Sequence, residues 1–209
     1  MNNSMHLYRD APIITDPWPH IIIDNFVPDD IYKFILRVFK EDTSPPDNYD
    51  DPHYPYGEVK APEKVLNHYD WTVLTNHFKA KIMKETVLDK WNIKHDEEIK
   101  VRIGIHRDHK HFFQDPHNDE KKYAKAVVSM QLYCPPDESL KDLGTTFWKK
   151  GPMPSDVDDT EGVVKTLEFL PNRCVSFRCT KESWHGVFPI KVDTHYNRNS
   201  LRLLYYVPV

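Results

Sequence analysis

The sequence predicts a mainly β protein with flanking helices (α+β), in which a jelly-roll or cupin-type double sheet carries a helical layer on its outside. Two stretches in the first half have helical periodicity, whereas from Glu98 onward the chain alternates between apolar and polar residues in short segments. The 17 prolines against 6 glycines indicate many loops and short strands rather than long helices. Eight or so short strands that follow two helices are typical of a double sheet.

The chain has 209 residues, enough for a single domain with a substantial core. We expect one domain over 1–209, with a helical N-terminal layer at about 26–97 and a β core at about 98–209. Residues 1–19 are polar and interrupted by prolines, so we expect a surface lead-in there. A short apolar run at 20–24 predicts the first strand.

Two helices are expected between this strand and the β core. The first is predicted over 29–39, where an apolar stripe at helical spacing consists of Ile31, Phe34, Ile35 and Val38. The second is predicted over 70–91, with Trp71, Leu74, Phe78 and Ile82 on one side. The segment between them, 41–64, is a long loop rich in Asp, Pro and Tyr, which is typical of a lid or binding loop.

The β core is predicted from alternation and from the turn residues between segments. The proline-rich and acidic segment 135–162 is read as a loop around one central strand. The expected strands are 99–106, 111–116, 124–134, 144–149, 163–169, 173–178, 184–189 and 199–207.

Composition excludes several classes of function. The net charge of −4 is mild, and no basic block indicates binding to nucleic acid. The longest apolar runs, such as 21–23, are too short to span a bilayer. The three cysteines are odd in number and irregularly spaced, which argues against a disulfide framework and favours a reducing, cytoplasmic location.

The candidate metal ligands begin with His117 and Asp119. They are two residues apart, so on extended backbone both side chains would lie on one face. One imidazole and one carboxylate make two-thirds of the 2-His-1-carboxylate triad that binds non-haem Fe(II). His185 is the best third ligand. A strand that returns antiparallel after the strand at 173–178 would carry it back toward the mouth of the sheet, and the adjacent Gly186 allows a close approach of backbone or ligand.

A second His-x-Asp pair, His106 and Asp108, fits the same pattern. It begins a charged stretch over 106–111 that reads as solvated, whereas His117 and Asp119 directly precede the strongest strand of the chain. The second pair is therefore the weaker candidate.

An anion site is predicted on the last strand. Arg198, Ser200 and Arg202 share one face, and a guanidinium inside a barrel needs an anion because its burial without a partner is costly. The planar fork of an arginine matches a carboxylate. On the strand after Asp119 the polar set Ser129, Gln131 and Tyr133 shares one face, and Tyr133 could reach the same anion.

The order of these residues resembles the Fe(II)/2-oxoglutarate-dependent oxygenases, above all their prolyl-hydroxylase-like branch. The likeness covers about residues 17–209 and is least typical over 41–97. The stretches that carry it are Phe113-Gln114-Asp115-Pro116-His117-Asn118-Asp119, Leu132-Tyr133-Cys134-Pro135, Leu143-Gly144-Thr145-Thr146-Phe147, Trp184-His185-Gly186-Val187 and Arg198-Asn199-Ser200-Leu201.

The resemblance implies a double-stranded β-helix fold that uses Fe(II), 2-oxoglutarate as cosubstrate and O2. It implies that His117, Asp119 and His185 form the catalytic metal site. Arg198 would hold the distal carboxylate of 2-oxoglutarate, with Tyr133 and Ser200 as helpers. Relatives that halogenate carry a small residue in place of Asp119, so the resemblance implies a hydroxylase that releases succinate and CO2.

The substrate is not written in the sequence, and a small molecule and a peptidyl group both remain open. The loops 41–64 and 135–162, and Trp184 beside the third ligand, are candidates for the walls of its site. Many relatives have two glycines where Leu143-Gly144 stands here, which alters the loop beside the metal. The alternative function is a cupin-type zinc or manganese protein or isomerase, favoured by the cluster of His106, His109, His111 and His117.

Overall fold

A computed structural model describes residues 2–41, 58–59, 69–94, 98–110, 112–121, 124–149, 162–191 and 198–208. Most of the loop at 41–64, most of the second half of the segment at 135–162, and His111 lie outside the described residues. Within them, no helix is both long enough and apolar enough to pass through a bilayer.

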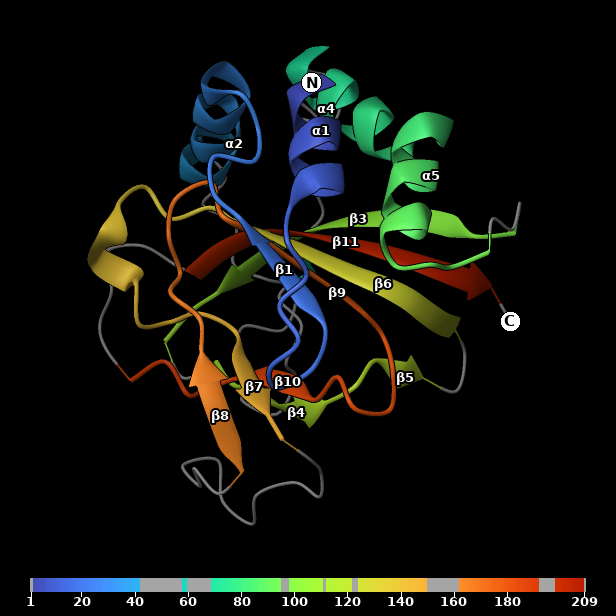
Figure 1. The fold of residues 1–209 in the computed structure, drawn as a ribbon. Coiled ribbons are helices and arrows are strands. Elements are labelled where there is room, and N and C mark those ends of the chain that lie inside the picture. Colours follow the sequence, from blue (N-terminus) through green and yellow to red (C-terminus); the bar gives the residue numbers. More distant parts are fainter. Residues whose placement is uncertain are drawn as a thin grey trace.

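Four helices are described: α1 (Asn2–Asp10), α2 (Asp29–Glu41), α4 (Tyr69–Lys79) and α5 (Lys81–Lys90). They lie together on one side of the molecule (Figure 1). The helix expected over 29–39 is α2, and its apolar stripe is buried. Asp29 and Asp30 occupy its first turn, where the helix dipole favours negative charge.

Two sequence predictions for the helical layer are wrong. Residues 1–19 are not only a surface lead-in, because α1 buries Tyr8 completely and Trp18 is 3% exposed. The helix expected over 70–91 is two helices that meet at Ala80, so the apolar side changes direction there. Ile82 is consequently 60% exposed, while Met83 is buried.

The strands form two antiparallel sheets, as the double-sheet prediction requires. The larger sheet has the order β1-β9-β6-β11-β3-β2, with β5 paired to β6, and the smaller has the order β4-β10-β7-β8. The strands of the larger sheet are β1 (His20–Ile23), β2 (Glu58–Val59), β3 (Lys100–Asp108), β5 (Glu120–Lys121), β6 (Ala124–Tyr133), β9 (Cys174–Arg178) and β11 (Arg198–Pro208). Those of the smaller sheet are β4 (Gln114–His117), β7 (Thr146–Trp148), β8 (Val163–Thr166) and β10 (His185–Val187), and a 3-10 turn at Glu138–Leu140 precedes β7.

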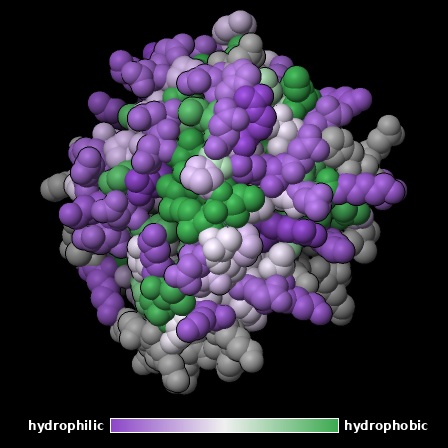
Figure 2. Space-filling model, in the orientation of Figure 1, coloured by the Kyte–Doolittle hydropathy of each residue, from purple (hydrophilic) through white to green (hydrophobic). Residues whose placement is uncertain are grey.

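The larger sheet separates two hydrophobic clusters. Its outer face packs against the helices through alternate residues of the central strands, such as Leu203 on β11 and Met130 on β6. Its inner face turns toward the smaller sheet, and aromatic residues including Trp18, Phe147 and Phe177 fill the space between the sheets. The surface is mostly hydrophilic on the face shown in Figure 2, with a small cluster of hydrophobic residues near its centre.

A row of polar side chains crosses the inner face of the larger sheet. Directly paired residues of antiparallel strands lie on the same face. Arg198 pairs with Asp108, and Ser200 lies between His106 on β3 and Tyr133 on β6. Arg202 pairs with Gln131. The parity predicted for β11 and β6 therefore places these polar groups on one face, toward the smaller sheet.

Candidate metal centre and its pocket

Two histidines of the candidate site are brought together by strand pairing in the smaller sheet. His185, the first residue of β10, is the direct partner of His117, the last residue of β4. The centres of their rings are 4.3 Å apart. The sequence suggested that β10 returns beside the strand at 173–178. It pairs with β4 and β7 instead, and this pairing sets the two rings side by side.

Asp119 joins the two histidines by a different route from the one that the sequence spacing suggested. It lies beyond the end of β4 with φ 59°, so the backbone between His117 and Asp119 is not extended. Aspartate tolerates this left-handed conformation better than most residues that are not glycine. The turn, rather than strand alternation, directs the carboxylate back to the imidazole.

Gly186 allows β10 to approach β4 closely, as its small size predicted. A Cβ at this position would lie 2.4 Å from the carbonyl oxygen of Gln114, much closer than two nonbonded atoms can come. A side chain here would therefore push β10 away from β4. Gly144, the single glycine of the Leu143-Gly144 pair, has a similar role, because its Cβ would overlap the carbonyl of Leu167.

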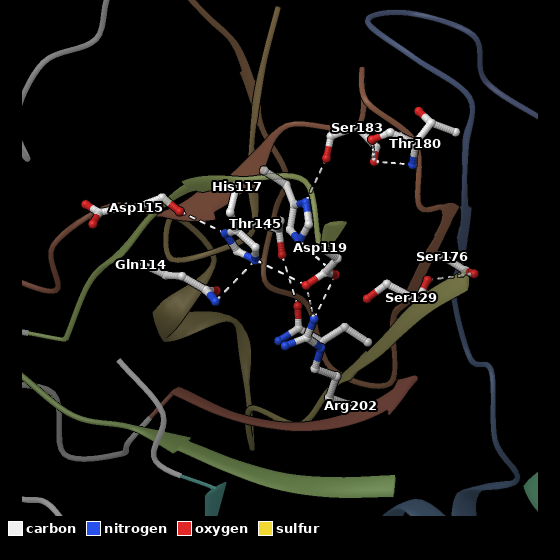
Figure 3. Close-up of polar contacts among 12 residues, drawn as sticks. Gln114, Asp115, His117, Asp119, Ser129, Thr145, Ser176, Thr180, Ser183 and Arg202 are labelled. Atoms are coloured by element: carbon white, nitrogen blue, oxygen red, sulfur yellow. Dashed lines mark hydrogen bonds and ion pairs between the residues drawn. The ribbon is translucent and has the colours of Figure 1, made fainter. Parts of the chain in front are cut away.

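Both imidazoles direct Nε2 toward Asp119. Nδ1 of His117 lies 2.8 Å from the carbonyl oxygen of Asp115, and Nδ1 of His185 lies 2.9 Å from that of Ser183. A carbonyl only accepts, so each Nδ1 carries a proton and the Nε2 of each neutral ring keeps its lone pair. The two Nε2 atoms lie 3.5 and 3.6 Å from the carboxylate oxygens of Asp119 (Figure 3).

The three side chains form a group of acceptors that suits a cation. All their ligand atoms lie within 4.8 Å of one another, and Asp119 and His185 are buried. Burial, and then the neighbouring His117, lower the pKa of His185 to about 3, so this ring is neutral at pH 7. Lone pairs and a carboxylate that converge without a shared proton are the arrangement that a metal ion completes.

Arg202 keeps Asp119 ionised. Its Nη2 donates to both carboxylate oxygens, at 2.6 and 2.7 Å. Burial alone would raise the pKa of Asp119, but the Arg202 guanidinium outweighs burial and holds this pKa well below its usual range. Figure 3 shows the guanidinium of Arg202 next to the carboxylate of Asp119.

A cavity of about 530 Å³, including its open mouth, connects the metal group to the other end of the polar row. His185 and Arg202 line it near the metal group, and Arg198 lines it further along β11. Arg198 is 1% exposed, and its guanidinium lies 4.9 Å from the centre of the Phe169 ring. The predicted anchor for an anion therefore opens into the same cavity as a metal ligand.

Arg198 already has a carboxylate partner that the sequence did not predict. Its Nη1 donates to Oδ2 of Asp108, and its Nε donates to the carbonyl oxygen of Leu143 at 2.5 Å. The expectation that 106–111 is solvated is therefore wrong for Asp108, which is 3% exposed and lines the cavity with His106. The sequence indicates that His106 and Asp108 lie on the same face of a strand, because they are two residues apart. Only the pairing of β3 with β11 shows that this is the face on which Arg198 and Ser200 lie.

The predicted helpers of Arg198, Tyr133 and Ser200, are buried and are linked by hydrogen bonds through Thr145 and Gln131. The hydroxyl of Tyr133 donates to Oγ1 of Thr145 and accepts from its backbone N–H, while Ser200 accepts from the amide of Gln131. Arg198 lies 5.9 Å above the Tyr133 ring. Thr145, which also donates to Gln131, lines the cavity and was missed by the sequence reasoning. Its polar side chain follows Gly144, and no residue spacing marks it.

The other sequence candidates contribute less to this site. Trp184, expected in the wall of the substrate site, is not among the residues that line the cavity. Its apolar wall consists of Val175, Phe177 and Val187. Among the described residues, the only group arranged to hold a metal is His117, Asp119 and His185, and neither His106 nor His109 joins it. The three cysteines are free thiols, as expected.

The fold is shared with known oxygenases. Neither a protein-family model nor a curated protein sequence matches this chain. Among solved structures, a prolyl-4-hydroxylase of Pseudomonas putida matches with a TM-score of 0.57 and 14% identity, over 97% of this chain and 90% of that one.

Two further structures are informative. EvdO2 of Micromonospora carbonacea var. aurantiaca, complexed with 2-oxoglutarate, matches with a TM-score of 0.57 and 11% identity over 99% of this chain and 91% of that one. SnoK, a non-haem α-ketoglutarate-dependent carbocyclase from nogalamycin biosynthesis, matches with a TM-score of 0.55 and 10% identity over 99% of this chain and 83% of that one. The chain therefore has the fold of the 2-oxoglutarate-dependent oxygenases, in the form that the prolyl-4-hydroxylases share.

Proposed function

We propose that this protein is an Fe(II)- and 2-oxoglutarate-dependent dioxygenase that hydroxylates an unactivated C–H bond of its substrate and releases succinate and CO2. The observation that carries the proposal is the position of two sites along one cavity. His185 of the His-Asp-His group lines one end together with Arg202, which holds Asp119, and the buried Arg198 on the same strand as Arg202 lines the other. A metal-chelating 2-oxo acid with a second carboxylate would use both.

In this proposal His117, Asp119 and His185 hold the iron, leaving positions for the cosubstrate and O2. The fit rests on the donor set: two imidazoles whose Nδ1 atoms bond backbone carbonyls and whose Nε2 atoms turn toward Asp119, and a carboxylate kept ionised by Arg202. The backbone carbonyls of Asp115 and Ser183 orient the rings and fix their tautomers. When bound, iron and 2-oxoglutarate together supply the oxidising chemistry.

Arg198 would bind the distal carboxylate of 2-oxoglutarate. It is the buried guanidinium at the far end of the cavity, and Tyr133, Thr145, Gln131 and Ser200 surround that end with hydroxyl and amide groups. Val175, Phe177 and Val187 would exclude water from the space between the anchor and the metal. The substrate is a small molecule or a peptidyl group. The free cysteines favour a reducing compartment such as the cytoplasm.

Loss of a ligand tests the metal site. Asp119→Ala and His185→Ala should each lower metal affinity and succinate production by at least about 100-fold, since loss of an outer partner alone costs 10–100-fold. Metal content after dialysis and succinate release measure the two effects. Asp142→Ala and His6→Ala, which change exposed residues of the same types, serve as matched controls. Full iron-dependent turnover by either ligand variant would contradict the assignment.

A spectroscopic measurement tests the cosubstrate and separates this proposal from a zinc or manganese protein. Under anaerobic conditions, Fe(II) and 2-oxoglutarate added to the protein should produce a weak visible charge-transfer band, because the 2-oxo acid would chelate the iron. His185→Ala should not produce it. A wild-type protein that binds iron but gives no band with 2-oxoglutarate would overturn the proposed reaction.

A further inference from the structure

The anchor that the proposed function assigns to 2-oxoglutarate already contains an anion. Arg198 and Asp108 are 1% and 3% exposed and form an ion pair between the paired ends of β11 and β3. Each has one buried polar atom without a hydrogen-bond partner among the described residues: Nη2 of Arg198 and Oδ1 of Asp108. Both side chains line the cavity.

The charges of Arg198 and Asp108 cancel each other only while no ligand carboxylate is bound beside them. One guanidinium and one carboxylate sum to zero, so a second carboxylate from a ligand would leave a net negative charge beside two almost fully buried side chains. Uncompensated charge is costly in such a site, and two carboxylates that share one place ionise together only with difficulty. One added proton restores neutrality and supplies a donor between the two acids.

We propose that Asp108 and the distal carboxylate of 2-oxoglutarate share one proton beside Arg198, so that binding of the cosubstrate is coupled to uptake of one proton from solvent. The proton is held between Oδ1 of Asp108 and the ligand, and Nη2 of Arg198 donates to the ligand carboxylate. This inference rests on the proposed function and makes Asp108 a positioning residue for the cosubstrate.

The surroundings of Asp108 make this carboxylate easier to protonate than an exposed one, although it pairs with Arg198 as an anion while the anchor is empty. Burial raises the pKa of Asp108 even though Arg198, and to a smaller extent His109, act to lower it. On the same face, His106 is held neutral because burial and the nearby arginines Arg202, Arg198 and Arg102 lower its pKa to about 3. Tyr133 on β6 stays neutral because burial raises its pKa. β2 pairs with β3 at Ile105 and His106, two residues short of Asp108.

The test measures protons rather than turnover. Mn(II)-loaded full-length protein is titrated calorimetrically with 2-oxoglutarate at pH 7.5 in two buffers of different ionisation enthalpy, which gives the number of protons taken up. Pyruvate is the matched probe, because it has the same 2-oxo acid head and no distal carboxylate. We expect close to one proton per 2-oxoglutarate and none for pyruvate.

The affinity gives a second, independent readout. Because the complex holds one more proton than the free protein, the Kd for 2-oxoglutarate should rise about tenfold per pH unit between pH 7 and 8, while that for pyruvate stays constant. In Asp108→Asn the proton uptake and this pH dependence should both disappear, and Asp142→Asn should keep both. The wild-type comparison of the two probes decides the question even if Asp108→Asn does not fold.

The outcomes separate the two proposals. Binding of 2-oxoglutarate without proton uptake would overturn the shared proton and leave the proposed oxygenase standing. Undiminished uptake in folded Asp108→Asn would remove Asp108 from the site. No binding of 2-oxoglutarate to metal-loaded protein would overturn the proposed function together with this inference.

Discussion

Two arginine–aspartate pairs lie four residues apart on β11, and the pKa values of their aspartates shift in opposite directions. Arg198 with Asp108 is 1% and 3% exposed by side chain, and Arg202 with Asp119 is 17% and 2% exposed. Burial raises the pKa of Asp108 in spite of its arginine, whereas the pKa of Asp119 is far below its usual range. Arg202 donates to both carboxylate oxygens of Asp119, whereas Oδ1 of Asp108 has no hydrogen-bond partner among the described residues. The number of hydrogen bonds to the carboxylate, rather than the presence of an ion pair alone, decides in which direction the pKa of a buried carboxyl shifts.

Breaking the more buried pair should give the largest effect. Arg198→Met leaves Asp108 buried without its partner and should destabilise the metal-free protein by about 3–5 kcal/mol. The double variant Arg198→Met/Asp108→Leu should recover most of that loss, because both charges are gone. Urea unfolding measures the three stabilities. A double variant no more stable than the single one would show that packing, not charge, is what Arg198 provides.

The two pairs should also differ in their effect on the cosubstrate. Arg198→Met should raise the Kd for 2-oxoglutarate by about 10–100-fold, the loss expected for a charge-assisted hydrogen bond of 1.5–3 kcal/mol. Arg202→Met should change it much less, because Arg202 faces Asp119 rather than the far end of the cavity. Titration of the Mn(II)-loaded variants gives both constants. The reverse order would move the anchor to Arg202.

His106 lies in register with Ser200, between the two pairs, and should make stability depend on pH. Its pKa is lowered to about 3 in the folded protein, below the usual value of 6.5. The unfolded chain therefore binds a proton that the folded chain does not, and stability falls as pH drops below 6.5. His106→Asn should remove up to about 1.4 kcal/mol of this loss per pH unit. Unfolding at pH 7.5 and 5.5 measures it, and a wild-type stability that does not fall would contradict it.

An exposed ion pair should contribute least to the free energy of unfolding. Arg173 donates to Asp24, whose side chain is 55% exposed. Asp24→Asn should cost no more than about 1 kcal/mol, and 1 M salt should reduce the difference between the variant and the wild type. Urea unfolding with and without salt checks this. An effect as large as that of Arg198→Met would mean that burial does not separate the two kinds of pair.

Much of the β core could be predicted from the sequence, because alternation reports which side chains share a face. The strand expected over 199–207 is β11 (Arg198–Pro208), and its polar and apolar residues do lie on opposite faces. The same reasoning missed α1. Of its described side chains only Ser4 and Tyr8 are fully buried, and most of the others are polar.

The site was predictable only as far as local pattern determines it. His117, Asp119 and His185 converge, yet the turn at Asp119 and the partner strand of His185 depend on backbone conformation and long-range pairing. Asp108 was set aside because its charged neighbours suggested solvent. Its burial depends on Arg198, 90 residues away in the sequence, and no local pattern contains that contact.

The contact at Gly186 has a consequence for the choice of ion. Since β10 and β4 approach closely there, the backbone sets the distance between the two strands that carry the imidazoles, and the carbonyls of Asp115 and Ser183 hold the two rings in place. A cradle of this kind selects by radius: a small transition-metal ion fits between two nitrogens and one acid, whereas calcium needs six to eight oxygens and longer bonds. Discrimination against calcium would then follow from the absence of a side chain at Gly186.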